Sequence, residues 1–205
     1  MNGDREKSYA YWLCTVPGLG GRSFQKLMDV YRDAEAVYRA GKGELSRLLK
    51  PQLLESLKAH KAKWQPAEEY ARLKESRIGF LTCGEPEYPH RLQSIPDAPP
   101  FLFYKGRLPE DDVLSVAVIG ARDCSDYGHF VARSLGEALG SCGIEVISGM
   151  ARGVDGISQQ AALQAGGFSC GVLGCGVDIC YPSRNRALYE LLLKRGGVLS
   201  AYVPG

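Results

Sequence analysis

The chain has 205 residues, of which 45% are hydrophobic and 23% charged, and its formal net charge is +2. This composition is ordinary for a globular protein and excludes a globally basic surface, so any nucleic-acid site must be a local cluster of cations. No apolar run reaches the ~18 residues that a membrane span needs, and the N-terminus lacks the pattern of a signal peptide. We therefore expect a cytoplasmic protein with no membrane partner.

Residues 1–77 are predicted to form a small all-α domain. Apolar residues recur at helical spacing from Phe24 to Tyr31, and Pro66, followed by two glutamates, is typical of a helix start. The stretch "VPGLGG" before the first of these helices is similar to a helix-hairpin-helix turn, which offers backbone N–H groups to phosphates. No lysine cluster surrounds this stretch in the sequence, so we expect it to serve packing.

Residues 78–112 are rich in proline and show little periodicity, which indicates an ordered connector with short strands. From 113 to 205, apolar strands alternate with helices, and this pattern predicts parallel β-α-β units. The first strand, "VLSVAVIG", is a continuous apolar run of the kind that is buried in parallel sheets. Right-handed crossovers are expected to place helices on both faces of the sheet.

Three loops follow the carboxyl ends of the first three predicted strands, and such loops meet at one edge of a parallel sheet. Their glycines permit close backbone approach, the helix N-termini that follow favour anions, and arginine guanidinium groups match phosphate oxygens. The predicted phosphate-binding residues are Gly120, Arg122, Ser125, Tyr127, Gly128, Gly149, Arg152, Gly153, Arg184, Asn185 and Arg186.

Motifs of several enzyme classes are absent from the sequence. No G-x-G-x-x-G follows the first strand and no P-loop motif occurs, which disfavours ordinary NAD binding and excludes a P-loop nucleotidase. The three histidines and seven cysteines are scattered without metal-ligand spacing, so we expect no metal and no cofactor. Asp155 and Asp178 leave a nucleotide-binding or nucleotide-cleaving Rossmann-like enzyme open as an alternative, although both side chains also suit helix or turn caps.

Four stretches in order resemble the DNA-processing protein A family, also called DprA/Smf: "AVIGARDCSDYG", "VISGMARGVDGISQQAALQAGG", "GVLGCGVDICYPSRNRALYELL" and "GGVLSAYVPG". The resemblance implies an α/β fold, in which a Rossmann-like parallel sheet follows a small all-α domain of sterile-alpha-motif-like or helix-hairpin-helix-like type. It also implies a protein without catalytic activity that binds single-stranded DNA, protects incoming strands in natural transformation and loads the RecA recombinase.

The same resemblance makes Arg122 a DNA contact and aligns Arg152 with a basic position, whereas Gln159 stands where the family commonly has histidine. Arg184 comes one residue after the place where the family often has a cation. The implied partners are single-stranded DNA, RecA and a second copy bound through the Rossmann-like domain. A RecA-interaction module without strong DNA binding stays a further alternative. Because the family normally continues past the point matching Gly205, we expect the C-terminal part of this domain to be missing.

Overall fold

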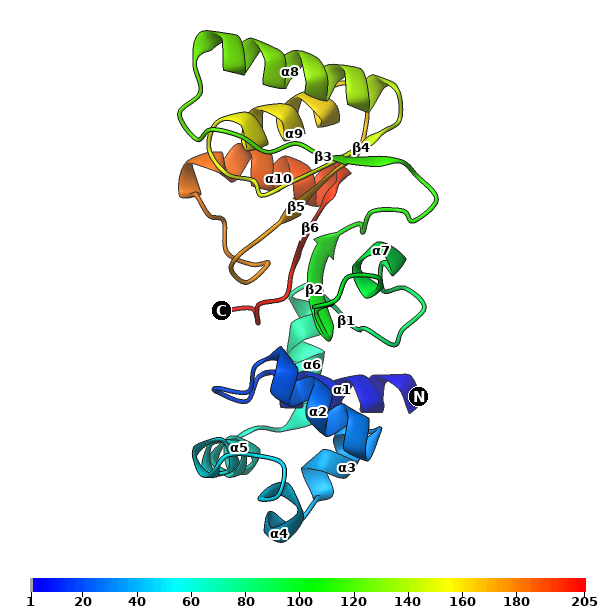
Figure 1. The fold of residues 1–205 in the computed structure, drawn as a ribbon, viewed down its shortest axis with the longest axis vertical. Coiled ribbons are helices and arrows are strands. Elements are labelled where there is room, and N and C mark those ends of the chain that lie inside the picture. Colours follow the sequence, from blue (N-terminus) through cyan, green and yellow to red (C-terminus); the bar gives the residue numbers. More distant parts are fainter. Residues whose placement is uncertain (1) are drawn as a thin grey trace. The chain divides into compact units, whose positions relative to one another are not determined.

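The computed structural model describes residues 2–205, and the chain divides into two compact units. The first unit runs to Pro86 and includes Asp97–Phe101, and the second comprises Glu87–Pro96 and Leu102–Gly205. In Figure 1 the first unit is drawn mainly in blue and cyan and the second mainly in green to red. Over residues 2–205, no helix combines the length and the apolar character needed to cross a bilayer.

The first unit is helical apart from one short strand. Its elements are α1 (Asn2–Cys14), α2 (Gly21–Tyr31), α3 (Ala34–Arg39), α4 (Lys42–Leu45), α5 (Pro51–Lys63), α6 (Pro66–Glu75) and β1 (Gly79–Thr82). Trp12 of α1 is fully buried and packs edge-on against Tyr38, with ring centroids 4.8 Å apart. Pro51 and Pro66 begin α5 and α6, where a missing N–H leaves no helical hydrogen bond unmade.

The second unit carries a sheet in the order β2-β6-β5-β4-β3. Its elements are α7 (His90–Gln93), β2 (Phe101–Gly106), β3 (Ser115–Ala117), α8 (Asp126–Ser141), β4 (Glu145–Ser148), α9 (Val154–Gln164), β5 (Ser169–Val172), η1 (Ser183–Asn185), α10 (Arg186–Arg195) and β6 (Gly197–Ser200). Strands β3 to β6 are parallel, and β2 pairs antiparallel with β6. The predicted Rossmann-like α/β fold, preceded by a helical part, is confirmed.

The three crossover helices lie on one face of this sheet. Strands β3, β4, β5 and β6 are neighbours in chain order, so each right-handed crossover places its helix on the same side. Helix α9 accordingly packs against both α8 and α10, as Figure 1 shows. The prediction of helices on both faces is wrong, because helices reach both faces only where the strand order reverses.

The edge strand β3 is not buried as its apolar run predicted. The side chains of Leu114, Val116 and Ile119 are 73%, 37% and 76% exposed. An apolar run is buried only where neighbours cover it, and β3 ends the strand order of the described chain. Helix α8 also exposes Phe130, and an open strand edge such as β3 favours self-association.

Glu145 places a carboxyl group inside this unit. The residue is 4% exposed, and its Oε1 accepts a hydrogen bond from the Glu110 N–H at 3.1 Å. Its Oε2 is buried without a hydrogen-bond partner among the described residues. Burial raises the pKa of this carboxyl group, and the Glu110 hydrogen bond and the charges of Arg91 and Arg107 offset only part of the rise.

We expect Glu145→Gln to change how stability depends on pH. A carboxyl group whose folded pKa is raised lowers stability as pH rises from the ordinary glutamate value of 4.5 through the folded pKa. The glutamine keeps an oxygen that accepts the Glu110 hydrogen bond but does not titrate. The variant should therefore melt at a higher temperature than the wild type at pH 8 and show no gain at pH 4. An equal gain at both pH values in thermal melts would contradict this account.

Candidate functional site

A cavity of about 460 Å³ opens at the carboxyl ends of the parallel strands in the second unit. The loops that follow β3, β4 and β5 all contribute to it, as the sequence predicted for loops at one sheet edge. It is lined by Arg122, Gly149, Ala151, Arg152, Leu173, Gly174, Cys175, Tyr181, Pro182 and Arg184. We call it the arginine cavity.

Each of the three loops supplies one arginine to this cavity. Arg122 and Arg184 are exposed and have no ion pair with any carboxylate of the described chain, whereas Arg152 pairs with Asp123. No carboxylate is part of the cavity lining. The guanidinium groups therefore give the cavity a positive potential, and their forked N–H groups match the oxygens of a phosphate.

The two aspartates of the enzyme alternative are bonded to backbone groups. Asp155 is 7% exposed, and its Oδ1 and Oδ2 accept the N–H groups of Gly120 and Gly149 at 3.4 and 3.2 Å. These bonds tie the end of β3 to the end of β4. Asp178 Oδ1 accepts the Gly205 N–H at 3.2 Å. Within residues 2–205, no group of three or more His, Cys, Asp or Glu side chains could hold a metal ion.

Gly153 allows the first two loops to touch. It has a φ of +79°, and a Cβ at this position would overlap the carbonyl oxygen of Ala121. The N–H of Val154 donates to that same oxygen at 3.2 Å. Only glycine combines this backbone conformation with such a close approach, so its role here is architectural.

Two amide side chains hold the loop after β4. Asn185 donates from Nδ2 to the carbonyl oxygens of Met150 and Ala151 at 2.9 and 3.1 Å. The fully buried Gln159 accepts the Met150 N–H through Oε1 at 3.0 Å and donates to the Ser169 hydroxyl at 3.1 Å. Met150 has a φ of +54°, in the left-handed region, and these bonds stabilise that conformation.

The structure brings some predicted residues into the cavity lining and leaves the others outside it. Those in the lining are Arg122, Gly149, Arg152 and Arg184. Those outside it are Gly120, Ser125, Tyr127, Gly128, Gly153, Asn185 and Arg186. Of the second group, Gly120, Gly153 and Asn185 position the loops.

Residues at the starts of α8 and α10 have other surroundings. Ser125 caps α8 by accepting the Gly128 N–H through Oγ at 3.2 Å. Tyr127 is largely exposed, and Arg186 lies 4.0 Å from Glu190 in a pair along α10. None of these side chains lines the arginine cavity.

The cavity lining also includes Tyr181 and Pro182, which are not among the predicted phosphate-binding residues. The peptide bond between them is cis, and the Tyr181 side chain is 69% exposed. An exposed aromatic ring beside arginines provides a surface on which a nucleobase stacks. Cys175 also lines the cavity, and burial, followed by the charge of Asp178, raises the pKa of its thiol, which is therefore neutral at pH 7.

Residues 79–205 match the model of the family described as DNA recombination-mediator protein A. The chain belongs to this family. A protein named Smf from Synechocystis sp. is 30% identical over 204 residues, which cover 96% of this chain and 51% of that protein. The chain thus spans about half the length of this relative.

Two solved structures of the same family are similar to the chain. DNA processing protein A (DprA) from Streptococcus pneumoniae has a TM-score of 0.76 and 27% identity, over 97% of this chain and 68% of that one. DprA from Helicobacter pylori, a structure described for its single-stranded DNA binding mode, has a TM-score of 0.55 and 28% identity. That likeness covers 62% of this chain and 56% of the other.

We expect Asn185→Ala to loosen the loop after β4 in this family member. The change leaves the carbonyl groups of Met150 and Ala151 without their donor, a loss of about 1–3 kcal/mol for partly buried polar groups. Hydrogen exchange of the amides in residues 149–153 should accelerate, while Arg186→Ala at the next position should leave it unchanged. If the amides of residues 149–153 exchange at the same rate in Asn185→Ala as in Arg186→Ala, Asn185 does not hold the loop.

Proposed function

We propose that this chain binds single-stranded DNA through the arginine cavity. The observation that carries the proposal is the convergence of Arg122, Arg152 and Arg184 on one cavity without a lining carboxylate. Forked guanidinium groups form paired, charge-assisted hydrogen bonds with phosphate oxygens, so phosphodiester groups fit this cavity. Membership of the DNA recombination-mediator protein A family supports this choice of ligand, as does the single-stranded DNA binding described for the Helicobacter pylori relative.

An unpaired strand suits this cavity better than a duplex. Arginine contacts to phosphates position a strand without reading its sequence. Tyr181 offers a ring face to a base, which an unpaired strand turns outward but a duplex keeps inside its stack. The chain should therefore bind single strands with little sequence preference and bind duplex DNA more weakly at the same salt concentration.

The proposal also includes a role in natural transformation. The resemblance implies that the protein protects incoming strands during natural transformation and loads RecA onto them, with RecA and a second copy as partners. Exposed apolar side chains, among them Ile119 in the loop after β3 and Phe130 on α8, provide surface for a protein contact. No catalytic step is proposed, because Asp155 and Asp178 bind backbone N–H groups. Hydrolysis of mononucleotides by the wild-type chain would favour the enzyme alternative.

Arg122→Gln is expected to lower the affinity for a labelled oligo-dT roughly tenfold, as the loss of one charged hydrogen-bonding contact predicts. Fluorescence anisotropy across a salt series measures this loss, and the salt slope should fall by about 0.7 for one phosphate contact.

The matched control is Arg133→Gln, which removes the same charge from the surface of α8, where Arg133 pairs with Glu137 at 3.0 Å. This control should bind oligo-dT as the wild type does. Equal losses in the two variants, or no loss for Arg122→Gln, would reject the arginine cavity as the site.

A further inference from the structure

The helical first unit contains a cationic groove that the proposed function does not use. The groove has a volume of about 560 Å³ and lies between the turn that precedes α2 and the start of α5. It is lined by Pro17, Gly18, Arg22, Ser23, Lys26, Leu48, Leu49, Lys50, Gln52, Leu53 and Ser56, and we call it the α2–α5 groove. Three of these residues are cations, and none is a carboxylate.

The three cations converge from two segments of the chain. Arg22 and Lys26 are one turn apart on α2 and therefore share a helix face. Lys50 directly precedes α5. The Lys26 Nζ donates to the Leu48 carbonyl oxygen at 2.9 Å, which holds its ammonium group against the segment before α5. Over residues 2–205 no carboxylate lies within ion-pairing distance of these three cations, unlike Lys74, which pairs with Asp4.

The turn "VPGLGG" combines packing with an open backbone. Val16 and Leu19 are buried, and Ser56 Oγ donates to the Pro17 carbonyl oxygen at 2.7 Å, which anchors the turn to α5. Gly18 has a φ of +81° and open space where a Cβ would stand. Helix α2 starts after Gly20 without a side-chain cap, so its first N–H groups add to the positive potential of the groove.

The clustering of the three groove cations could not be predicted from their positions in the sequence. The expectation that "VPGLGG" serves packing holds for Val16 and Leu19, but it rested on the lack of a nearby lysine cluster. The fold assembles the cluster by bringing Lys50 to the side of α2 that carries Arg22 and Lys26. Uncompensated cations gathered at a groove attract a polyanion.

We propose that the α2–α5 groove is a second DNA-binding surface, in which Arg22, Lys26 and Lys50 neutralise phosphates of the sugar–phosphate backbone. The choice of DNA as the polyanion rests on the proposed function. No aromatic side chain lines the groove, so it has no ring on which to stack a base. It therefore contacts the backbone alone and does not distinguish an unpaired strand from a duplex.

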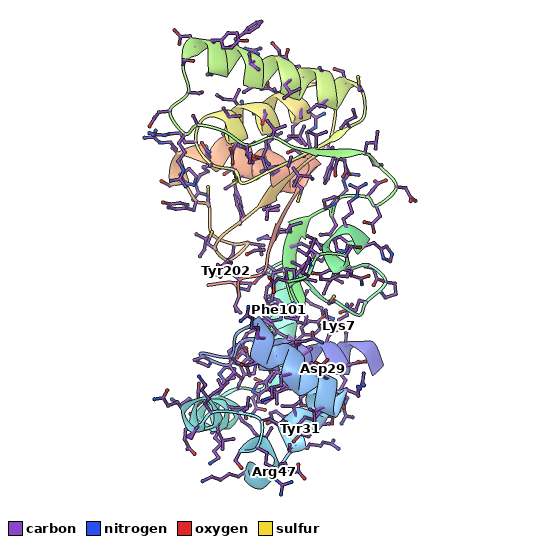
Figure 2. The ribbon with its side chains drawn as sticks, viewed as in Figure 1. Lys7, Asp29, Tyr31, Arg47, Phe101 and Tyr202 are labelled. Atoms are coloured by element: carbon purple, nitrogen blue, oxygen red, sulfur yellow. The ribbon has the colours of Figure 1, made fainter. Side chains whose placement is uncertain are left out.

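The test uses the full chain with the triple substitution Arg22→Gln, Lys26→Gln and Lys50→Gln. All three side chains are exposed, so the variant is expected to keep the wild-type melting temperature. The control triple substitution, Lys42→Gln, Arg47→Gln and Lys63→Gln, removes the same charge from exposed positions of this unit outside the groove. Figure 2 labels Arg47, which follows α4.

Anisotropy titrations with a thirty-nucleotide oligo-dT and with a duplex of equal length measure the effect across a salt series. The groove variant should lose affinity for both ligands by roughly tenfold or more, with a salt slope for oligo-dT lower by about two, as loss of three phosphate contacts predicts. The control should bind both ligands as the wild type does.

Equal affinities of the groove variant and the control would overturn the proposal. A loss of binding to polyglutamate as large as the loss for DNA would also overturn it, because the groove would then take acidic polypeptides. If Arg122→Gln binds normally while the groove variant is weak, the arginine cavity fails and the α2–α5 groove stands. If the groove variant fails to fold, Lys50→Gln alone should still lower affinity about threefold and reduce the slope for oligo-dT by about 0.7, and an unchanged slope would overturn the proposal.

Discussion

The buried carboxylate of Asp155 is the constraint on which the arginine cavity depends. It accepts the N–H groups of Gly120 and Gly149 and so fixes the ends of β3 and β4 relative to each other. Gly153 lets the loops that follow these strands touch, and Asn185 ties the loop after β5 to the loop after β4. Removing the carboxylate would leave two backbone donors unpaired at the point where the loops meet.

This arrangement separates the residues that build the site from those that bind. The side chains that build the site form hydrogen bonds with backbone and buried groups, as Asp155, Gln159 and Asn185 do. In contrast, Arg122 and Arg184 form no ion pair with the described carboxylates. Backbone geometry carries the arginines to one cavity, and their side chains stay available to a ligand. The net charge of the chain is only +2, yet the arginine cavity has a positive potential because cations gather there without a lining carboxylate. The α2–α5 groove gathers cations without a lining carboxylate in the same manner, between helices.

Local patterns predicted the elements well because helix and strand periodicities and proline at helix starts are properties of short segments. Pro66 begins α6, and Arg122 and Arg184 line one cavity, as their places after strands indicated. The sequence did not predict the features that depend on how distant segments of the chain pack together. The exposure of Ile119 depends on strand order, and the α2–α5 groove depends on Lys50 folding beside α2. The Asn185 side chain can donate a hydrogen bond to a ligand, which is why the sequence indicated a binding role. In the fold its amide instead donates to the carbonyl oxygens of Met150 and Ala151.

The central claim is that single-stranded DNA lies in the arginine cavity, and photo-crosslinking tests it most directly. An oligo-dT that carries 5-bromouracil is bound, irradiated and mapped by mass spectrometry. Within the second unit, crosslinks should fall on Tyr181, which lines the cavity. Tyr127 and Tyr202 are similarly exposed but lie outside the lining, and Figure 2 labels Tyr202 after β6. Crosslinks at these two tyrosines without any at Tyr181 would contradict the account.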